Sequence, residues 1–152
     1  MDLPFFLRKE EEMKGGLVKD WMTQNPISVG SNVTMPDAYW KMINNKIRRL
    51  LVIDDGILTG IVTIDDLQQK IPWTAFALNA VHASDILSKF PVRLVMTQKL
   101  ITTTPETSLF DAANSMISNE ISTLPVLQDD QVVGIITESD IFRAFVELAS
   151  EE

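Results

Sequence analysis

Apolar and polar residues alternate along the chain in a pattern that predicts short strands and amphipathic helices. Leu50–Ile53 and Ile57–Thr63 are apolar runs separated by Asp54-Asp55-Gly56, which predicts a β-hairpin with glycine in its turn. A strand at Ile27–Val29 and a helix from Asp65 to Lys70 flank this hairpin. Before the hairpin, apolar side chains recur at the spacing of one helix face, at Met35, Ala38, Tyr39, Met42 and Ile43.

The second half of the chain repeats this order. Strands are predicted at Ile101–Thr103, Leu124–Leu127 and Val132–Thr137, and a final helix at Ser139–Leu148. The matching helix face consists of Leu109, Ala112, Ala113, Met116 and Ile117. Eighteen of the fifty residues from 18 to 67 are identical to the residue 74 positions later, whereas unrelated sequences would share about three. The chain is therefore a tandem repeat of one β-α-β-β-α unit.

This organisation predicts an α+β fold, an α/β sandwich built from two repeats. A unit of about fifty residues has too little core to be stable alone, so we expect the two to pack about a pseudo-twofold axis. The chain divides into an N-terminal leader (1–16), a first repeat (17–70), an apolar helical connector (71–91) and a second repeat (92–149). The leader is expected to be a mobile, frayed terminus, and the alternative is that Phe5 and Phe6 dock on a partner surface.

The composition argues against several classes of function. A net charge of −8 disfavours a nucleic acid or an anionic membrane as partner. The chain has no cysteine and one histidine, which excludes thiolate zinc sites, cysteine nucleophiles and histidine-rich metal sites. No apolar run reaches the roughly 18 residues that span a bilayer. No signal peptide is recognised, so the cytoplasm is the expected compartment.

Both repeats carry the same strand-to-helix junction, Thr63-Ile64-Asp65-Asp66 and Thr137-Glu138-Ser139-Asp140. The structural interpretation is a helix cap, in which the threonine accepts from a backbone N–H and the aspartate bonds back and favours the positive helix end. The functional interpretation is a ligand site. There the carboxylate accepts two hydrogen bonds from a ribose diol, while the hydroxyl and helix N–H groups face a phosphate. The two interpretations are compatible.

An enzyme is the weaker hypothesis. His82 is the single histidine, so a Ser-His-Asp set has no other source of a base, and no glycine-rich phosphate loop is present. Asp65 and Asp66, or Asp54 and Asp55, are placed to pair in acid–base chemistry, but cap and turn chemistry already explain their positions. We expect no catalytic residue and no metal, and a surface or packing role for His82.

The two repeats resemble a tandem pair of CBS domains, the regulatory module named after cystathionine β-synthase. The resemblance is carried by residues 18–23, 47–54 and 60–66 in the first copy and by 92–97, 121–126 and 134–140 in the second. It covers residues 17–146. The connector and residues 143–148 further resemble stand-alone proteins of the acetoin-utilisation type. One departure is Leu51, where the family commonly has proline and the second copy has Pro125.

The resemblance implies a non-catalytic sensor that requires no cofactor. Such pairs bind an adenosine compound, such as AMP, ADP, ATP or S-adenosylmethionine, in two clefts between the repeats. The junction aspartate holds the ribose, and residues before the second strand reach the phosphate from the facing repeat. The implied binding residues are Thr137, Ser139 and Asp140 with Arg48 and Arg49; Thr63 and Asp66 with Ser122 and Thr123; and the backbone near Ile27 and Ile101. Family members commonly dimerise through their helices, so we expect a homodimer that signals to an unknown partner protein.

Charge ranks the two implied clefts. Arg48 and Arg49 offer guanidinium groups for charge-assisted bonds to phosphate, whereas Ser122 and Thr123 are neutral donors. The cleft with Asp140 is therefore predicted to be the site for a phosphorylated nucleotide. The alternative is a ligand-free module of the same fold that acts by dimerising or by docking on a partner.

Overall fold

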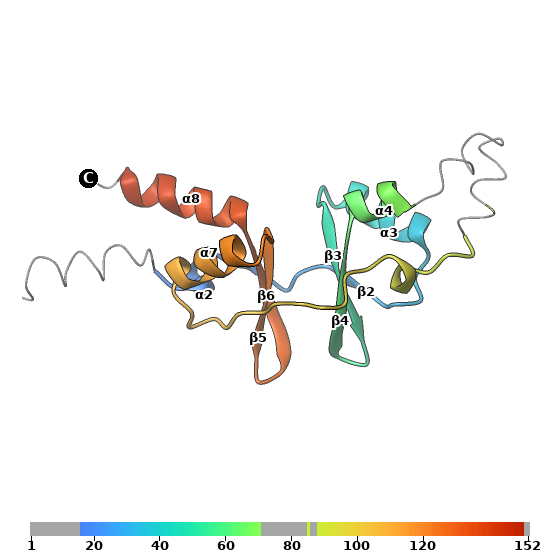
Figure 1. The fold of residues 1–152 in the computed structure, drawn as a ribbon, viewed down its shortest axis with the longest axis horizontal. Helices are drawn as coiled ribbons and strands as arrows, with labels where there is room; N and C mark the ends of the chain where they lie inside the picture. Colours follow the sequence, from blue (N-terminus) through green and yellow to red (C-terminus); the bar gives the residue numbers. More distant parts are fainter. Residues whose placement is uncertain (1–15, 71–84, 86–87, 151–152) are drawn as a thin grey trace, which may run out of the picture. The chain divides into compact units, whose positions relative to one another are not determined.

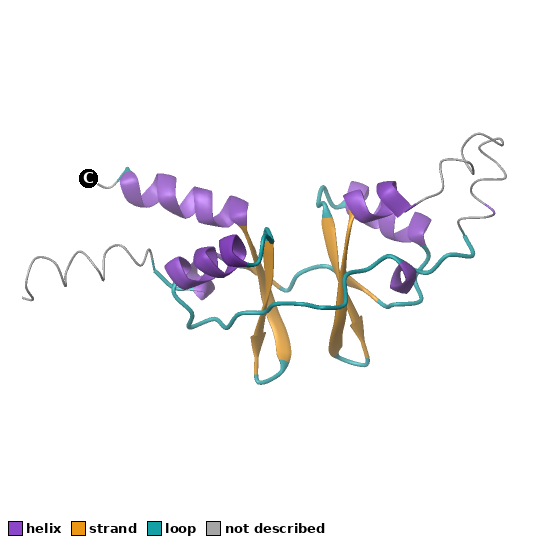
Figure 2. Cartoon of the chain, viewed as in Figure 1, coloured by secondary structure: helices purple, strands orange, loops and turns teal. Residues whose placement is uncertain are grey.

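The computed structural model describes residues 16–70, 85 and 88–150 of the chain (Figure 1). The chain divides into two compact units. Unit 1 combines Met1–Pro26 with Ile101–Glu152, and unit 2 is Ile27–Leu100. Each unit contains one three-stranded sheet with helices beside it, which confirms the predicted α+β class (Figure 2).

Unit 2 contains most of the first repeat. Its elements are β2 (Ser28–Val29), α3 (Met35–Asn44), β3 (Arg49–Asp54), β4 (Ile57–Thr63), α4 (Ile64–Lys70) and the 3₁₀ turn η1 (Val92–Leu94). β3 and β4 form an antiparallel hairpin, and β2 lies parallel to β3 on its other edge. In the hairpin turn Asp55 and Gly56 have φ of 50° and 77°, which these two residue types tolerate well. Thr34 begins α3 because its hydroxyl accepts the N–H of Asp37 at 3.3 Å.

Unit 1 repeats this architecture. Its elements are α2 (Val18–Trp21), β1 (Thr23–Gln24), α7 (Leu109–Ser118), β5 (Thr123–Gln128), β6 (Gln131–Thr137) and α8 (Glu138–Ala149). β6 is the central strand, with antiparallel neighbours β1 and β5. Ser108 caps α7 by accepting the N–H of Asp111 at 3.0 Å. The cap, helix and hairpin therefore occur in the predicted order in both units.

Matching positions form the hydrophobic core of each unit. The core of unit 2 includes Met35, Ala38, Met42, Leu50, Val52 and Val62. The core of unit 1 includes Leu109, Ala112, Met116, Leu124, Val126 and Ile136. Each of these residues lies 74 positions from its counterpart. The sequence repeat therefore corresponds to two equivalent cores.

The segment that leads each repeat packs in the unit formed mainly by the other repeat. Val18 is fully buried in the core of unit 1, among residues of the second repeat. Val92 is fully buried in the core of unit 2, among residues of the first. The backbone follows the same arrangement, since β1 pairs with β6 and Thr97 bridges Ile61.

The compact units consequently differ from the repeats read in the sequence. The repeats at 17–70 and 92–149 are defined by similarity, whereas the units are defined by contacts. The division into sequence repeats remains a prediction, and the exchange of leading segments is a feature that similarity does not reveal.

The predicted strand at Ile101–Thr103 is wrong. Thr103 makes a single parallel bridge to β5, in which its N–H donates to the Pro125 carbonyl at 2.9 Å and its carbonyl accepts from Leu127 at 2.9 Å. The next rung of the ladder needs an N–H at Pro125, and proline has none. Leu51 occupies this position in the first repeat, and there β2 pairs with β3 over two residues.

Several expectations fall outside the described residues. They concern the leader, most of the connector and His82. The remaining predicted elements are present, with ends that differ by one or two residues from the predicted ones.

Candidate functional site

The candidate site is built on the two strand-to-helix junctions. In unit 2, β4 ends at Thr63 and α4 follows directly. The N–H of Thr63 donates to Oδ2 of Asp66 at 2.9 Å, and the N–H of Asp66 donates to the hydroxyl of Thr63 at 3.1 Å. This reciprocal pair of bonds is the capping box that the structural interpretation predicted. Asp66 is half-buried.

The junction in unit 1 has a different set of bonds. The N–H and the hydroxyl of Thr137 both donate to Oδ2 of Asp140, at 2.8 and 3.1 Å. Oδ1 of Asp140 accepts from Nη2 of Arg143, one turn along α8, at 2.7 Å. The side chain of Asp140 is 9% exposed, so this carboxylate is buried and paired.

Arg143 is absent from the predicted binding residues. The signal that would have found it is the spacing of an acid and a base three positions apart on one helix, which places their side chains together.

Arg48 and Arg49 lie beside the junction of their own unit. Arg49 is opposite Thr63 in the β3–β4 ladder. The carbonyl of Arg48 accepts the first N–H of α4, from Ile64, at 2.9 Å. The guanidinium group of Arg48 contacts Asp65 at 3.4 Å, with side chains that are 69% and 66% exposed. An ion pair this exposed is weak, so Asp65 does little to hold the guanidinium group of Arg48 in place.

Ser122 and Thr123 hold the equivalent place in unit 1. Thr123 is opposite Thr137 in the β5–β6 ladder, and the carbonyl of Ser122 accepts the N–H of Glu138 at 3.0 Å. The hydroxyl oxygen of Thr123 is buried, and no residue in the described part of the chain hydrogen-bonds to it. Buried hydroxyls normally have a partner, so this one is a candidate contact for a ligand.

The remaining predicted residues pack against the hydrophobic cores or lie in the first turn of α8. Ile27 and Ile101 are half-buried and pack against the cores of unit 2 and unit 1. Their side chains are therefore used for packing, and the predicted contact from this region involves backbone. Ser139 is exposed and directly precedes Asp140.

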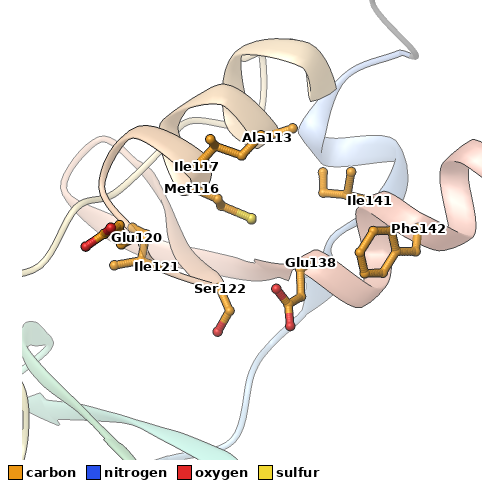
Figure 3. Close-up of a pocket in the computed structure, with 9 residues that line it drawn as sticks. All are labelled: Ala113, Met116, Ile117, Glu120, Ile121, Ser122, Glu138, Ile141 and Phe142. Carbon is orange, nitrogen blue, oxygen red and sulfur yellow. The ribbon is translucent and has the colours of Figure 1, made fainter.

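A cavity of about 480 Å³ opens in unit 1 beside the junction (Figure 3). It is lined by Ala113, Met116, Ile117, Glu120, Ile121, Ser122, Glu138, Ile141 and Phe142. Figure 3 shows Ser122 and Glu138 near each other at one edge, and apolar side chains of α7 and α8 at the opposite side. Glu120 and Ile121, which follow α7, complete the lining. Because this lining contains two acids and no base, the cavity suits an apolar group better than a phosphate.

The described residues contain neither a metal-binding cluster nor a membrane-spanning helix. No group of three or more His, Asp or Glu side chains there is arranged to bind a metal ion. None of the helices in this part of the chain has the length and hydrophobicity needed to cross a membrane.

Comparison with protein families gives a match in both repeats. The family model of the CBS domain matches residues 18–72 and 92–147. The first curated relatives are longer proteins, and this chain spans 47%, 34% and 56% of their length. Two other relatives are enzymes, of which the matched chain covers 23% and 24%.

Solved structures match the described fold along most of their length. The CBS domain pair of protein MJ0100, in complex with 5′-methylthioadenosine and S-adenosyl-L-methionine, is 32% identical with a TM-score of 0.71, over 87% of this chain and 97% of that one. CBSX2 in complex with AMP is 28% identical with a TM-score of 0.71, over 88% and 98%. A protein assigned to acetoin utilization (AcuB) from Vibrio cholerae is 30% identical with a TM-score of 0.70, over 90% and 97%.

Proposed function

This chain belongs to the CBS domain family and carries two CBS domains in tandem, and on that premise we propose that it is a regulatory module that binds an adenosine compound and signals to a partner protein. The observation that carries the proposal is the repeated junction. In each repeat an aspartate carboxylate is fixed at a helix start by the backbone N–H of a threonine. A carboxylate held in this way is a suitable acceptor for the two hydroxyls of a ribose.

The ligands of the two related structures support this class of ligand. MJ0100 was crystallised with two adenosine compounds and CBSX2 with AMP, and both are related to this chain over nearly its whole length. The proposed contacts are Asp66 and Asp140 for the ribose, with the adjacent Thr63 and Thr137 near the phosphate. Ser139 and the backbone near Ile27 and Ile101 complete the proposed sites. A regulatory role agrees with the enzymes among its relatives, in which this region is about a quarter of the chain.

We assign the phosphorylated nucleotide to Asp140, with Arg48 and Arg49 supplying positive charge. The argument is that guanidinium groups bind phosphate more strongly than the hydroxyls of Ser122 and Thr123 do. The competing assignment is the Asp66 junction, because both arginines lie beside it in their own unit.

Thermal unfolding in the presence of AMP, ATP, S-adenosylmethionine and NAD tests the proposal. A compound that binds the folded state raises the melting temperature at concentrations well above its Kd. We expect at least one of these compounds to do so, and Asp140→Ala to remove the shift while Asp66→Ala retains it. The reverse result assigns the nucleotide to the Asp66 junction, and no shift with any compound refutes the sensor.

A ligand-free docking module is the second candidate function. It is favoured by the apolar surface of unit 1, where Ile117 of α7 and Phe142, Phe145 and Val146 of α8 are 77%, 66%, 72% and 61% exposed. Such side chains are expected to be covered by another protein surface. We propose that a second copy of this chain covers them, and sedimentation of the wild type and of Phe145→Glu tests the homodimer. A dimer that persists in this variant places the interface elsewhere.

A further inference from the structure

Arg143 links two parts of unit 1 that meet at the proposed ribose site. Its Nη2 donates to Oδ1 of Asp140 at 2.7 Å and to the carbonyl of Trp21 at 3.3 Å. The Asp140 side chain is 9% exposed and that of Arg143 is 55% exposed. A buried carboxylate is costly without a partner, and Arg143 supplies one from the solvent side.

The bonds to Asp140 fix both of its oxygens. Oδ2 accepts from the N–H and the hydroxyl of Thr137, and Oδ1 accepts from Arg143. A carboxylate has about four acceptor positions, so these three bonds set the plane of the group and leave capacity for an incoming hydroxyl. An acceptor that is already oriented loses less conformational entropy when a ligand binds.

The corresponding aspartate in unit 2 is held less firmly. Oδ2 of Asp66 accepts the N–H of Thr63, whose hydroxyl is used as an acceptor for the N–H of Asp66. The residue three positions after Asp66 is Gln69, at the place of Arg143. The α4 helix therefore lacks the arginine that, in α8, donates to the second carboxylate oxygen of the aspartate. The two junctions therefore share a sequence motif and differ in how tightly the carboxylate is oriented.

We propose that Arg143 is a positioning residue that orients Asp140 toward a ribose diol, which makes the Asp140 junction the one that distinguishes ribose from deoxyribose. The proposal rests on the proposed function and adds a residue and a specificity to it. Arg143 acts through Asp140 and has no contact with the ligand in this scheme. Its bond to Trp21 keeps the guanidinium group in place beside the carboxylate.

Calorimetric titration with AMP and with 2′-deoxy-AMP tests the proposal. The wild type is expected to bind AMP more tightly than 2′-deoxy-AMP. Arg143→Gln introduces the residue found in the first repeat, and it should reduce the ratio of the two affinities by about five-fold or more, since a hydrogen bond to a charged group is lost. Arg143→Lys retains a positive charge with one donor group and should give an intermediate ratio.

Arg93→Gln is the matched control. Arg93 is an exposed arginine of unit 2 whose Nε donates to the side chain of Asn32 at 3.2 Å, so its loss should leave the ratio unchanged. A merely structural role of Arg143 lowers both affinities equally and preserves the ratio, which overturns the proposal. A wild type that binds the two nucleotides equally, or binds neither, also overturns it. The proposed function itself is judged separately, by the thermal shifts with all four compounds.

Discussion

Gly134 faces Met22 in unit 1 at a distance that leaves no room for a side chain. A Cβ atom built on Gly134 would lie 2.5 Å from the sulfur of Met22 and 3.0 Å from the carbonyl oxygen of Thr23. Gly60 and Met96 have the same relationship in unit 2, with a distance of 2.6 Å. The glycine in each return strand therefore admits the leading segment of the other repeat.

Gly134→Ala is accordingly expected to destabilise the protein. The methionine can move, but the backbone of Thr23 cannot retreat without loss of its pairing with β6. We expect a loss of about 1–3 kcal/mol in the free energy of unfolding, measured by urea denaturation. Gly30→Ala is the control, because its Cβ would make an ordinary contact of 3.5 Å with Asp54. Equal stability of the two variants would show that the close packing at Gly134 has no energetic consequence.

The exchange of leading segments predicts which unit a core mutation weakens. Val18 is fully buried in unit 1, so Val18→Ala should cost about 1–3 kcal/mol and lower the amide exchange protection of α7, β5 and β6. Val92→Ala should instead lower the protection of α3, β3 and β4. Hydrogen exchange read by mass spectrometry checks both. If Val18→Ala weakens α3 and β3 more than α7, the segment belongs to its own repeat.

Much of the fold follows from local sequence. The hairpins are predicted because Asp55 and Gly56 suit positive φ and the flanking residues are apolar, and the helices because their apolar residues recur with helical spacing. The exchange of leading segments is not predictable in this way. Gly60 and Gly134 are preceded and followed by similar residues, so nothing local shows which of them meets Met22.

The site was predicted only in part, because some of its features depend on local sequence and others depend on contacts between distant segments. The Thr–Asp pair is a local pattern, and its capping bonds are confirmed in Thr63 and Asp66. The strand predicted at Ile101–Thr103 is absent because Pro125 lies opposite this segment, and the two are more than twenty residues apart in the sequence. The arginine bound to Asp140 depends on a side-chain conformation, which spacing permits but does not require.

The lowered pKa of Asp54 predicts that the stability of unit 2 depends on pH. Hydrogen bonds from the Ser31 N–H at 2.9 Å and the Thr59 hydroxyl at 3.2 Å hold the pKa of Asp54 below its ordinary value of 3.8. Because the folded pKa is depressed, the stabilisation is present above 3.8 and is lost as the pH falls through the folded pKa. Asp54→Asn should therefore melt at a lower temperature than the wild type at pH 7.

The difference in melting temperature between Asp54→Asn and the wild type should narrow as the pH falls from 3.8 through the folded pKa, because Asp54 then becomes neutral like asparagine. Asp55→Asn is the control. Asp55 is exposed and has φ of 50°, a conformation that asparagine also adopts, so little change is expected at any pH. A difference for Asp54→Asn that stays constant from pH 7 to pH 3 would contradict the assigned role of its charge.

A substitution at Thr123 tests the stability of the fold and the binding of a ligand separately. Its hydroxyl is buried without a partner among the described residues, and valine has the same shape without the hydroxyl. Replacing an unsatisfied buried hydroxyl by a methyl group should leave the free energy of unfolding unchanged or raise it by up to about 2 kcal/mol. If the hydroxyl contacts a ligand, it does so in the cleft implied with Asp66. Thr123→Val should then reduce the rise in melting temperature caused by a compound whose effect Asp66→Ala also removes. Thr59→Val is the matched control, because the Thr59 hydroxyl bonds to the Val52 carbonyl and to Asp54, both at 3.2 Å. This control should lose stability and retain the rise in melting temperature caused by that compound. A Thr123→Val variant that behaves like Thr59→Val would show that the hydroxyl serves the fold and has no part in binding.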